Sequence, residues 1–316
     1  MFLSCGDALF DLFAGGSDHP AVIQLDGRAG GAPMNVAIGL SRLGQKVDFF
    51  SKVSRDIFGE RIMAHLANEG VETGLIIRTE QLSTLAIVSL DSAGAARYSF
   101  YIENTADRSI SEIELPAALP NEIKVIHIGG SYSTALEPSA SSYAALVARE
   151  RDRRLICYDP NIRDSVAPDL DLWRARVATL ASMAHLIKAS EEDLAKLFPG
   201  RSAQSVARDW IAGGASLVLI TLGGEGALGF TANGLAARVP GIKVKVIDTV
   251  GAGDTFQAAT LDWLARKNRL SPEALASLTS QELHAMLTYA AKAAAITCSR
   301  RGADLPRASE LAGEFA

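Results

Sequence analysis

Short apolar runs alternate with longer amphipathic segments along most of the chain. The short runs are typical of buried strands, and the longer segments repeat apolar residues at helical spacing. Strands that alternate with helices in this way predict a parallel sheet covered by helices on both faces, which is a doubly wound α/β core. The expected strands are Phe2–Phe13, Val47–Val53, Val125–Ile128, Leu155–Tyr158, Leu186–Lys188 and Leu217–Thr221. The expected helices are Pro33–Leu43, Ile57–Asn68, Pro138–Arg151, Leu172–Met183, Ser202–Ala212, Thr255–Lys267 and Ser280–Cys298.

Part of the first third of the chain breaks this alternation, because strands follow one another without a helix between them. The extra strands are Val22–Leu25, Thr84–Leu90 and Arg97–Ile102. Ser92-Ala93-Gly94 is suited to the turn of a hairpin between the last two. We therefore expect a small β-sheet lid, formed by about residues 12–29 and 84–107, on a single domain that spans residues 1–316. No repeat or Pro-rich linker indicates a separate second domain.

Composition and charge exclude several classes of protein. The chain has 316 residues, with 31 Lys and Arg against 36 Asp and Glu, which gives a net charge of −5. A nucleic-acid-binding surface needs an excess of basic residues, so we expect no nucleic-acid partner. No apolar stretch approaches the roughly 20 residues that span a bilayer, and the first residues lack the basic region of a signal peptide. Three cysteines without a CxxC pair favour a reducing compartment, and we expect a cytoplasmic protein.

The strongest local motif is Asp248–Phe256, which joins an expected strand, Val244–Ile247, to the helix that follows. Small residues at Gly251, Ala252 and Gly253 let backbone N–H groups converge, and the helix N-terminus adds positive potential. Such a nest suits a phosphate group. A carboxylate at Asp254 would repel a static phosphate, but it suits a base that takes a proton from an attacking hydroxyl. The alternative is an ordinary Gly-rich turn with Asp254 near a helix N-cap.

A second motif lies at Ala29–Ala37 and contains Gly30, Gly31, Pro33 and Asn35. Paired glycines allow a ligand to approach the backbone closely, and Pro33 suits an early helical position. Asn35 can both donate and accept hydrogen bonds, as a polyol requires of its binding site. A loop followed by a helix start is the plainer interpretation of this segment alone.

Together, the two motifs resemble those of the PfkB (ribokinase-like) family of carbohydrate kinases, and the resemblance covers essentially the whole chain. Asp56-Ile57-Phe58-Gly59 is similar to a third family element at a helix start. The resemblance implies a ribokinase-like three-layer α/β/α sheet with a β lid over the sugar. It also implies that Asp254 is the catalytic base and that residues 251–253 form the anion hole. Asp11 matches the acceptor of a sugar hydroxyl, and Gly30, Gly31 and Asn35 would help to bind the sugar.

Asp159-Pro160-Asn161-Ile162-Arg163 follows an expected strand and is similar to the DxNxR element of fructokinases and ketodeoxygluconate kinases. The resemblance therefore adds Asp159, Asn161 and Arg163 to the expected substrate-binding residues. Arg163 could clamp a phosphate by charge-assisted hydrogen bonds, with a surface salt bridge as the alternative.

The resemblance implies a nucleotide site around Thr221, Gly223 and Gly226, which follow another expected strand. Gly224–Gly229 also fits GxGxxG, but the next residues have the pattern of a strand, whereas the dinucleotide fingerprint opens a helix. A P-loop kinase is excluded because the chain has no Walker A motif.

One departure from the family pattern concerns the NxxE element, where this chain has Ser190 and Asp193. Ser190 is expected near the nucleotide, and Asp193 would contact Mg²⁺ at most through water. Mg²⁺ is expected to arrive with ATP and to neutralise the transferring charge. By resemblance, a monovalent cation such as K⁺ would lie near Asp248.

The sequence thus predicts an ATP-dependent sugar kinase that phosphorylates a primary hydroxyl, with fructose as the expected sugar and a homodimer through the lid as an expected assembly. The first alternative is 2-keto-3-deoxygluconate. Related kinases for that acid tend to place Arg where this chain has Glu103, although Arg97 or Arg108 could supply a charge. The alternative from another class is a non-catalytic sugar-binding regulator on a kinase fold.

Overall fold

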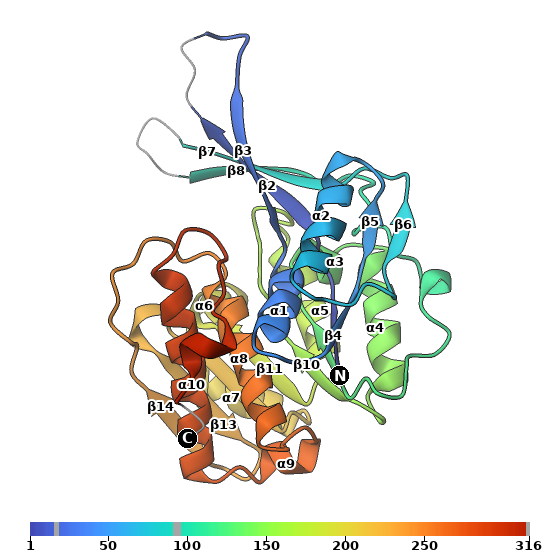
Figure 1. The fold of residues 1–316 in the computed structure, drawn as a ribbon. Helices are drawn as coiled ribbons and strands as arrows, with labels where there is room; N and C mark the ends of the chain where they lie inside the picture. Colours follow the sequence, from blue (N-terminus) through green and yellow to red (C-terminus); the bar gives the residue numbers. More distant parts are fainter. Residues whose placement is uncertain (16–18, 91–95, 314–316) are drawn as a thin grey trace.

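The main sheet of the molecule has eight strands in the order β14-β13-β12-β11-β10-β9-β1-β4 (Figure 1). The computed structural model describes residues 1–15, 19–90 and 96–313, without the side chains of residues 90 and 96–98. The strands are β1 (Phe2–Cys5), β4 (Val47–Phe50), β9 (Val125–Ile128), β10 (Leu155–Tyr158), β11 (Leu186–Ser190), β12 (Leu217–Thr221), β13 (Ala227–Thr231) and β14 (Ala236–Val239). Pairing is parallel from β4 through β12, and β13 and β14 add an antiparallel edge.

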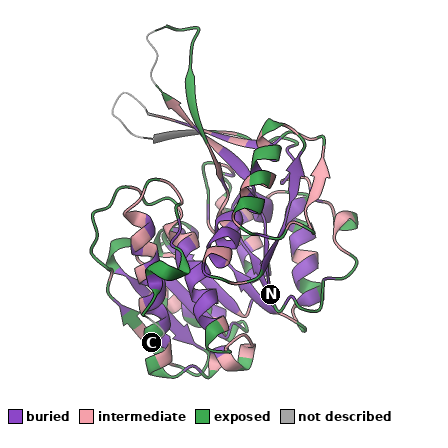
Figure 2. Ribbon diagram, in the orientation of Figure 1, coloured by how far each residue is buried: buried purple, intermediate pink, exposed green. Residues whose placement is uncertain are grey.

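Helices cover both faces of this sheet and create two separate hydrophobic cores. Successive strand residues point to opposite faces, so Phe2 packs into one core and Leu3 into the other. The first core contains α1 (Ala32–Arg42), α2 (Ile57–Asn68), α8 (Ala252–Arg266), α9 (Pro272–Ala276) and α10 (Ser280–Cys298). The second contains α4 (Ser139–Glu150), α5 (Leu170–Ala181), α6 (Glu191–Leu197) and α7 (Ala203–Ala212). The buried layers lie at the centre of the body (Figure 2), and the expected doubly wound α/β core is confirmed.

A four-stranded sheet projects from the body and forms the lid sheet (Figure 1). Its order is β3-β2-β7-β8. The strands are β2 (Leu9–Gly15), β3 (Gln24–Gly30), β7 (Thr84–Leu90) and β8 (Ala96–Tyr101). The pattern of strands without helices therefore corresponds to a separate sheet, while the expected hairpin turn at Ser92-Ala93-Gly94 lies outside the described residues. A two-stranded sheet of β5 (Lys52–Ser54) and β6 (Ile77–Thr79) lies beside α2.

Asp107 ties the base of the lid sheet to the body. Its buried carboxylate accepts hydrogen bonds from the Ala8 amide at 3.0 Å, the Thr84 hydroxyl at 2.5 Å and the Tyr132 hydroxyl at 2.5 Å. Ala8 precedes β2, Thr84 begins β7, and Tyr132 begins α3 (Tyr132–Ala135) in the body. One side chain thus holds both entry points of the lid sheet against the main fold.

Three sequence-based strand assignments are wrong. The run from Phe2 to Phe13 is two strands, because Gly6 turns the chain at φ 138° and sends β2 into the lid sheet. The run from Val47 to Val53 is also two strands, which belong to different sheets. Val244–Ile247 is not a strand: Val246 and Ile247 are exposed and join no sheet, so the β-branched pattern there does not mark a buried strand. None of the helices in the described part of the chain is long and apolar enough to cross a membrane.

Candidate active site

The N-terminus of α8 forms the centre of the candidate site. Gly251 is the N-cap residue at φ 78°, a left-handed conformation that favours glycine. A Cβ atom at Gly251 would also lie 2.7 Å from Cβ of Ala303, so the C-terminal segment packs tightly beneath the turn. The Ala252 amide donates to the Thr249 carbonyl at 3.2 Å. Within the described parts of the chain, the Gly251 and Gly253 amides have no protein acceptor, which leaves them for an anion.

Asp254 lies in the first turn of α8 and faces the start of α1. Its Oδ2 accepts a 2.8 Å hydrogen bond from the side-chain amide of Asn35. Burial raises the pKa of Asp254 to about 6, although the hydrogen bond from Asn35 and the charge of Lys188 both act to lower it. A carboxylate with a pKa near 6 is ionised at neutral pH and is basic enough to accept a proton.

Lys188 is a site residue that the sequence interpretation did not single out. Its ammonium group donates to Oδ2 of Asp159 at 2.7 Å, and both side chains are buried. A Cβ atom added to Gly253 would lie 2.9 Å from Lys188 Nζ, so the ammonium group borders the first turn of α8. Burial lowers the pKa of Lys188, but Asp159 and other carboxylates outweigh it and leave the pKa raised. A lysine within an otherwise apolar strand was the sequence signal that could have revealed it.

The lid sheet contributes Asp11 and Gly30 on neighbouring strands. A Cβ atom at Gly30 would lie 2.6 Å from Oδ2 of Asp11, so only glycine leaves room for the carboxylate. Burial raises the pKa of Asp11 to about 6, and the charge of Arg163 opposes this shift. Gly31 has φ 120°, and a side chain there would collide with the carbonyl of Asp7 at 2.3 Å. The two glycines therefore fix how α1 begins and where Asn35 points.

The segment after β10 contains Asn161 and Arg163, at the carboxyl edge of the main sheet. Asn161 adopts φ 42°, and its amide donates to Oδ1 of Asp159 at 3.2 Å. Arg163 is exposed, and its positive charge acts on both Asp11 and Asp254. The structure thus gathers Asp11, Arg163 and Asp254 into one electrostatic environment, although they come from distant parts of the sequence.

The expected nucleotide residues lie at the carboxyl ends of β11 and β12. Ser190 and Thr221 are paired across these two parallel strands. Gly223 and Gly226 follow with φ 55° and φ 102°, and a side chain at Gly226 would lie 2.0 Å from the Val239 carbonyl. The carboxyl edge of a parallel sheet is where α/β proteins bind ligands. The GxGxxG match at Gly224–Gly229 enters β13, as its strand pattern indicates.

Both carboxylate oxygens of Asp193 accept hydrogen bonds from protein groups. Its Oδ1 accepts from the Ile162 amide at 3.0 Å, and its Oδ2 accepts from the Ser190 hydroxyl at 2.6 Å. Ser190 and Asp193 form a capping box that begins α6, which explains a serine and an aspartate at this spacing. Among the described residues, no three His, Cys, Asp or Glu side chains are grouped to hold a metal ion.

Asp248 joins the loop before α8 to the C-terminal segment. Its two carboxylate oxygens accept from the Val250 amide at 3.1 Å and from the Gly302 amide at 2.8 Å. Each carboxylate oxygen has a further lone pair, so the group can still coordinate a cation.

Comparisons with known proteins give a consistent result. Residues 4–310 match the model of the pfkB family of carbohydrate kinases. The chain is 38% identical over 288 residues to a fructokinase of Rhizobium leguminosarum bv. trifolii, an alignment that covers 90% of this chain and 85% of the relative.

Solved structures agree with this match. A fructokinase from Xylella fastidiosa with bound ATP superposes with a TM-score of 0.89 at 28% identity, covering 99% of this chain and 97% of that one. A double-mutant fructokinase from Vibrio cholerae O395 with fructose, ADP and potassium ion superposes with a TM-score of 0.83 at 26% identity, covering 100% of this chain and 98% of that one.

Proposed function

The chain belongs to the pfkB family of carbohydrate kinases, and on that premise we propose that it transfers the γ-phosphate of ATP to a primary hydroxyl of fructose. The observation that carries the mechanism is the position of Asp254. Its carboxylate, with a pKa raised by burial to about 6, lies at the N-terminus of α8 beside Gly253. A base and an anion-binding helix end are therefore adjacent, as phosphoryl transfer to a hydroxyl requires.

In the proposed reaction, the Asp254 carboxylate accepts the proton of the sugar hydroxyl as its oxygen forms a bond to the γ-phosphorus. The bond from that phosphorus to the bridging oxygen breaks, and ADP keeps the electron pair. Several groups would stabilise the charge on the transferring phosphoryl group: the free amides of Gly251 and Gly253, the Lys188 ammonium group and the exposed Arg163. Asp11, Asn35 and Asn161 would orient the sugar, and Gly30 and Gly31 would give it close access to the backbone.

Fructose is favoured over 2-keto-3-deoxygluconate by the charges near the lid sheet. Glu103 forms an ion pair with Arg108 at 2.7 Å. Arg108 also donates to the carbonyl of Ile102 at 3.3 Å, so this arginine already has partners. An acidic sugar would have to displace Glu103 from Arg108, whereas a neutral ketose would not. The sequence alternative at Arg97 lies outside the described side chains. The names of the relatives, which are fructokinases, support the same choice.

A coupled assay for ADP release tests both the reaction and the sugar. We expect turnover on fructose and much weaker turnover on 2-keto-3-deoxygluconate. Asp254→Asn should lower kcat by about 10²- to 10⁴-fold, the usual contribution of a general base. Asp152→Asn is the matched control, since Asp152 is a fully exposed aspartate remote from this site. An Asp254→Asn enzyme as active as the control would contradict the mechanism.

ATP would bind along the edge formed by Ser190, Thr221, Gly223 and Gly226. Mg²⁺ would accompany the ATP phosphates. Asp193 is buried and accepts three hydrogen bonds, from the Ile162 amide and from the amide and hydroxyl of Ser190, so we propose that it contacts the ion only through water. When bound, Mg²⁺ would neutralise part of the negative charge of the phosphates. Asp248 would hold K⁺ between the 248–251 loop and Gly302, and exchange of K⁺ for Na⁺ should then change the kcat of the wild type more than that of Asp248→Ala.

We also propose a homodimer formed through the lid sheet. β3 and β8 are its outer strands, and side chains on or beside it are exposed and apolar: Val22, Ile23, Leu25 and Tyr101. Unpaired strand edges with apolar side chains favour association with another sheet. Ile23→Lys should shift light-scattering mass from dimer to monomer. Ile113→Lys, at an apolar residue away from the lid sheet, should leave the mass unchanged. A wild-type monomer would contradict this assembly.

The cytoplasm is the proposed location. The three cysteines are free, and Cys5 and Cys157 are buried where a reducing environment would keep them as thiols. Cell fractionation with a tagged chain tests this, and recovery from a secreted fraction would contradict it.

A further inference from the structure

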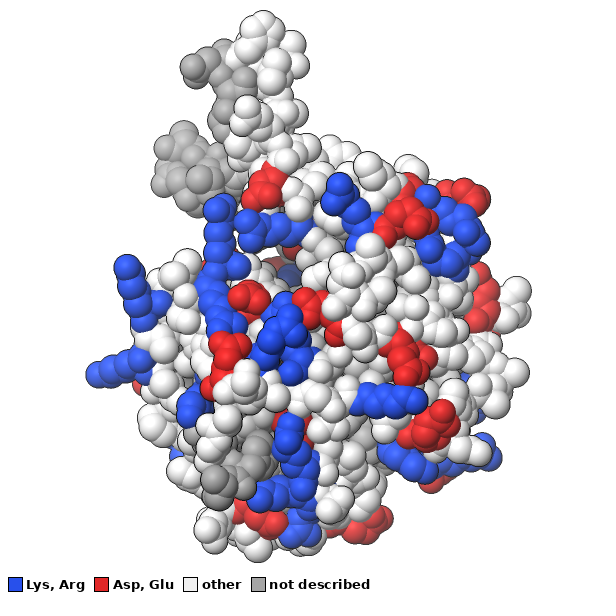
Figure 3. All heavy atoms as spheres, in the orientation of Figure 1, with Lys and Arg blue, Asp and Glu red and all other residues white. Residues whose placement is uncertain are grey.

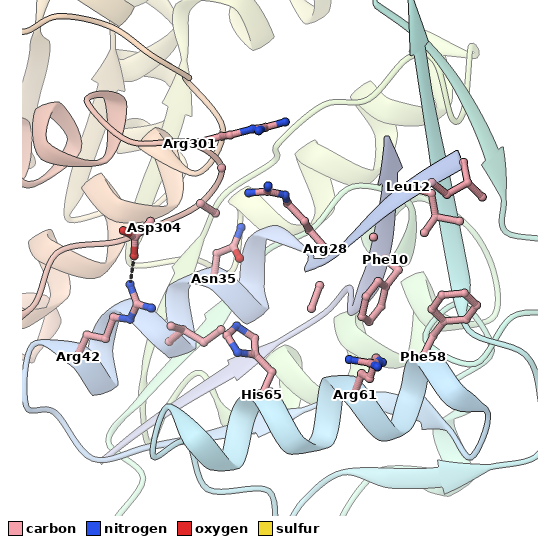
Figure 4. Close-up of a pocket in the computed structure, with 16 residues that line it drawn as sticks. Phe10, Leu12, Arg28, Asn35, Arg42, Phe58, Arg61, His65, Arg301 and Asp304 are labelled. Carbon is pink, nitrogen blue, oxygen red and sulfur yellow. Dashed lines mark hydrogen bonds and ion pairs between the residues drawn. The ribbon is translucent and has the colours of Figure 1, made fainter. Parts of the chain in front are cut away.

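A cavity lies at the β3 edge of the lid sheet, where β3 is an outer strand. It has a volume of about 710 Å³ and is bordered by β2, β3, α1, α2 and residues 301–304 (Figure 4). Phe10 and Leu12 line it from the face opposite Asp11, because side chains alternate along a strand. Arg28 is in register with Asp11 and shares its face, so the cavity extends around the edge of β3. Asp11, Arg163 and Asp254 do not line it. A cavity of this size can enclose a small organic ligand.

Positive charge dominates the lining. Four arginines from four different elements contribute, namely Arg28, Arg42, Arg61 and Arg301. Asp304 is the acidic lining residue, and His65 adds an imidazole. The whole chain carries a net charge of −5, so this concentration of arginine runs against its composition. Basic side chains also gather on the surface below the lid sheet, with acidic ones beside them (Figure 3). The cavity is therefore suited to an anion.

The arginines differ in how far protein partners satisfy them. Arg42 is fully engaged, because it donates to both oxygens of Glu69 and to Asp304. Arg28 pairs with Asp26 at 3.1 Å at an exposed position. Arg61 and Arg301 form no ion pair or hydrogen bond within the described residues. Figure 4 shows Arg28 and Arg301 extending toward the same part of the cavity, with Arg61 on the opposite wall. Arg61 and Arg301 are exposed, so an anion between these walls would replace water as their partner.

The rest of the lining is apolar and aromatic. The rings of Phe10 and Phe58 lie 5.1 Å apart at 53°, and Leu12 and Ile38 extend this surface. A free inorganic anion would leave the apolar wall unused. A ligand with a phosphate group and a compact carbon skeleton would use both, since a sugar ring packs its C–H groups against aromatic side chains.

The cavity shares structural elements with the catalytic centre without sharing its catalytic carboxylates. Asn35 lines it and donates to Asp254. Arg28 is paired with Asp11 across β2 and β3. A Cβ atom on Gly302 would lie 3.3 Å from Arg28 Nη1, and the Gly302 amide holds Asp248. A ligand held by Arg28, Arg61 and Arg301 would link the lid sheet to α2 and to the C-terminal segment.

We propose that this cavity is a regulatory site for a phosphorylated sugar, which binds between Arg28, Arg61 and Arg301. The bound effector holds β3 against the body. Because Asp11 lies on the neighbouring strand, the lid is then ordered before the substrate arrives, and the substrate sugar binds with less loss of conformational entropy. The expected result is a lower KM for the substrate with little change in kcat. The binding site does not depend on which sugar is the substrate, whereas the kinetic effect rests on the proposed kinase reaction.

Calorimetry tests the site directly. Fructose 1,6-bisphosphate and inorganic phosphate are titrated separately into protein saturated with Mg²⁺ and a non-hydrolysable ATP analogue. The bisphosphate should bind, at least about tenfold more tightly than inorganic phosphate, because only the sugar phosphate uses the apolar wall. Arg61→Gln and Arg301→Gln should each weaken its binding about tenfold or more. Arg208→Gln, at an exposed arginine outside the cavity, and Asp11→Asn in the catalytic site should bind it as the wild type does.

Each outcome decides a separate part of the proposal. Binding that persists in Arg61→Gln and Arg301→Gln, or that Asp11→Asn abolishes, would overturn the cavity as the site. Equal affinity for inorganic phosphate would overturn the assignment of a sugar phosphate. In the coupled assay, the effector should lower the sugar KM of the wild type about fivefold or more, and an unchanged KM would overturn the regulatory coupling. Because calorimetry needs no turnover, a wrong substrate would leave the binding result intact.

Discussion

The side-chain amide of Asn35 donates a 2.8 Å hydrogen bond to Oδ2 of Asp254, across 219 residues of sequence. The bond joins the first turn of α1 to the first turn of α8. A hydrogen bond to the ionised form stabilises it, so Asn35 acts against the burial that raises the pKa of Asp254. A residue of the other motif therefore contributes to the protonation state of the base, together with burial and the charge of Lys188.

The first prediction concerns the pH profile of the wild type. Asp254 must be ionised to accept a proton, and its pKa is raised to about 6. The kcat should therefore rise with pH through about 6 and level off above it. Asp11 also has a pKa raised to about 6, so kcat/KM should fall more steeply on the acid side than kcat does. The Asp11→Asn variant should have a higher sugar KM, but its kcat should still fall on the acid side as that of the wild type does. A wild-type kcat that is flat from about pH 5 to 8 would contradict the role of Asp254.

The second prediction uses Asn35 itself. Asn35→Ala removes a donor to the carboxylate, so the pKa of Asp254 should rise and the acid limb of kcat should move to higher pH. A structural role alone would lower kcat at every pH without moving the limb. The measurement is a set of pH profiles for the wild type and the variant under saturating sugar. A limb that stays in place or moves to lower pH would contradict the assignment.

The third prediction separates the structural and catalytic roles of Lys188. Lys188→Met leaves the buried Asp159 carboxylate without its partner and should destabilise the protein by about 3–5 kcal/mol. The double variant Lys188→Met with Asp159→Asn carries no buried charge at this pair and should recover much of that stability. It should not recover activity, because the ammonium group beside Gly253 is still missing.

Denaturant unfolding and the coupled assay measure these two effects separately. The control is Lys196→Met, which breaks an ion pair of the same 2.7 Å length with Asp164 at an exposed position. Exposed pairs contribute about 0–1 kcal/mol. A double variant with wild-type kcat would show that Lys188 serves stability alone.

The main sheet could be predicted from the sequence because its strands are continuous apolar runs that buried parallel strands require. Val125–Ile128, Leu155–Tyr158 and Leu217–Thr221 have the predicted bounds in the structure. The breaks within Phe2–Phe13 and Val47–Val53 could not be predicted in this way. The first run stays largely apolar across its break, and only a backbone turn at Gly6 sends its second half to another sheet. The second run contains no Gly or Pro that would mark where it divides.

Some residues of the candidate site could likewise be predicted from the sequence, and others could not. Asp254, Gly251 and Asn35 stand in local motifs whose residue types already suggest anion binding and polyol recognition. Lys188 and Asp107 belong to no local motif, and their roles arise from burial and from partners distant in sequence. Asp193 shows a further limit: its spacing from Ser190 resembles a metal-associated element, while the same spacing forms a capping box in the structure.

The last prediction concerns Asp107, whose pKa is raised to about 7 by burial and by the neighbouring Asp7. In its neutral form, Asp107 can donate to the Thr84 hydroxyl. The Thr84 hydroxyl then donates to the Thr105 hydroxyl at 2.7 Å, and the Thr105 hydroxyl donates to the Ile102 carbonyl at 3.0 Å. Each hydroxyl group in this series of hydrogen bonds then has both a donor and an acceptor partner. An unfolded aspartate has a pKa near 3.9. An acid whose pKa is raised by folding stabilises the protein below the unfolded pKa, and this contribution is lost as pH rises through the folded pKa.

The free energy of unfolding should therefore lose a contribution from Asp107 between about pH 4 and 7. Asp107→Asn presents a donor group on one side and an acceptor oxygen on the other at every pH, as the neutral acid does, although its NH2 group carries one more N–H. The variant should thus show a shallower fall in Tm across this range, with the remaining slope due to Asp7, whose pKa is also raised by burial. Tyr132→Phe removes one donor to the carboxylate and should steepen the slope, since the ionised form loses a partner. Parallel Tm curves for the wild type and Asp107→Asn would mean that the Asp107 carboxyl group is ionised throughout, and the base of the lid sheet would then be held by charge-assisted hydrogen bonds.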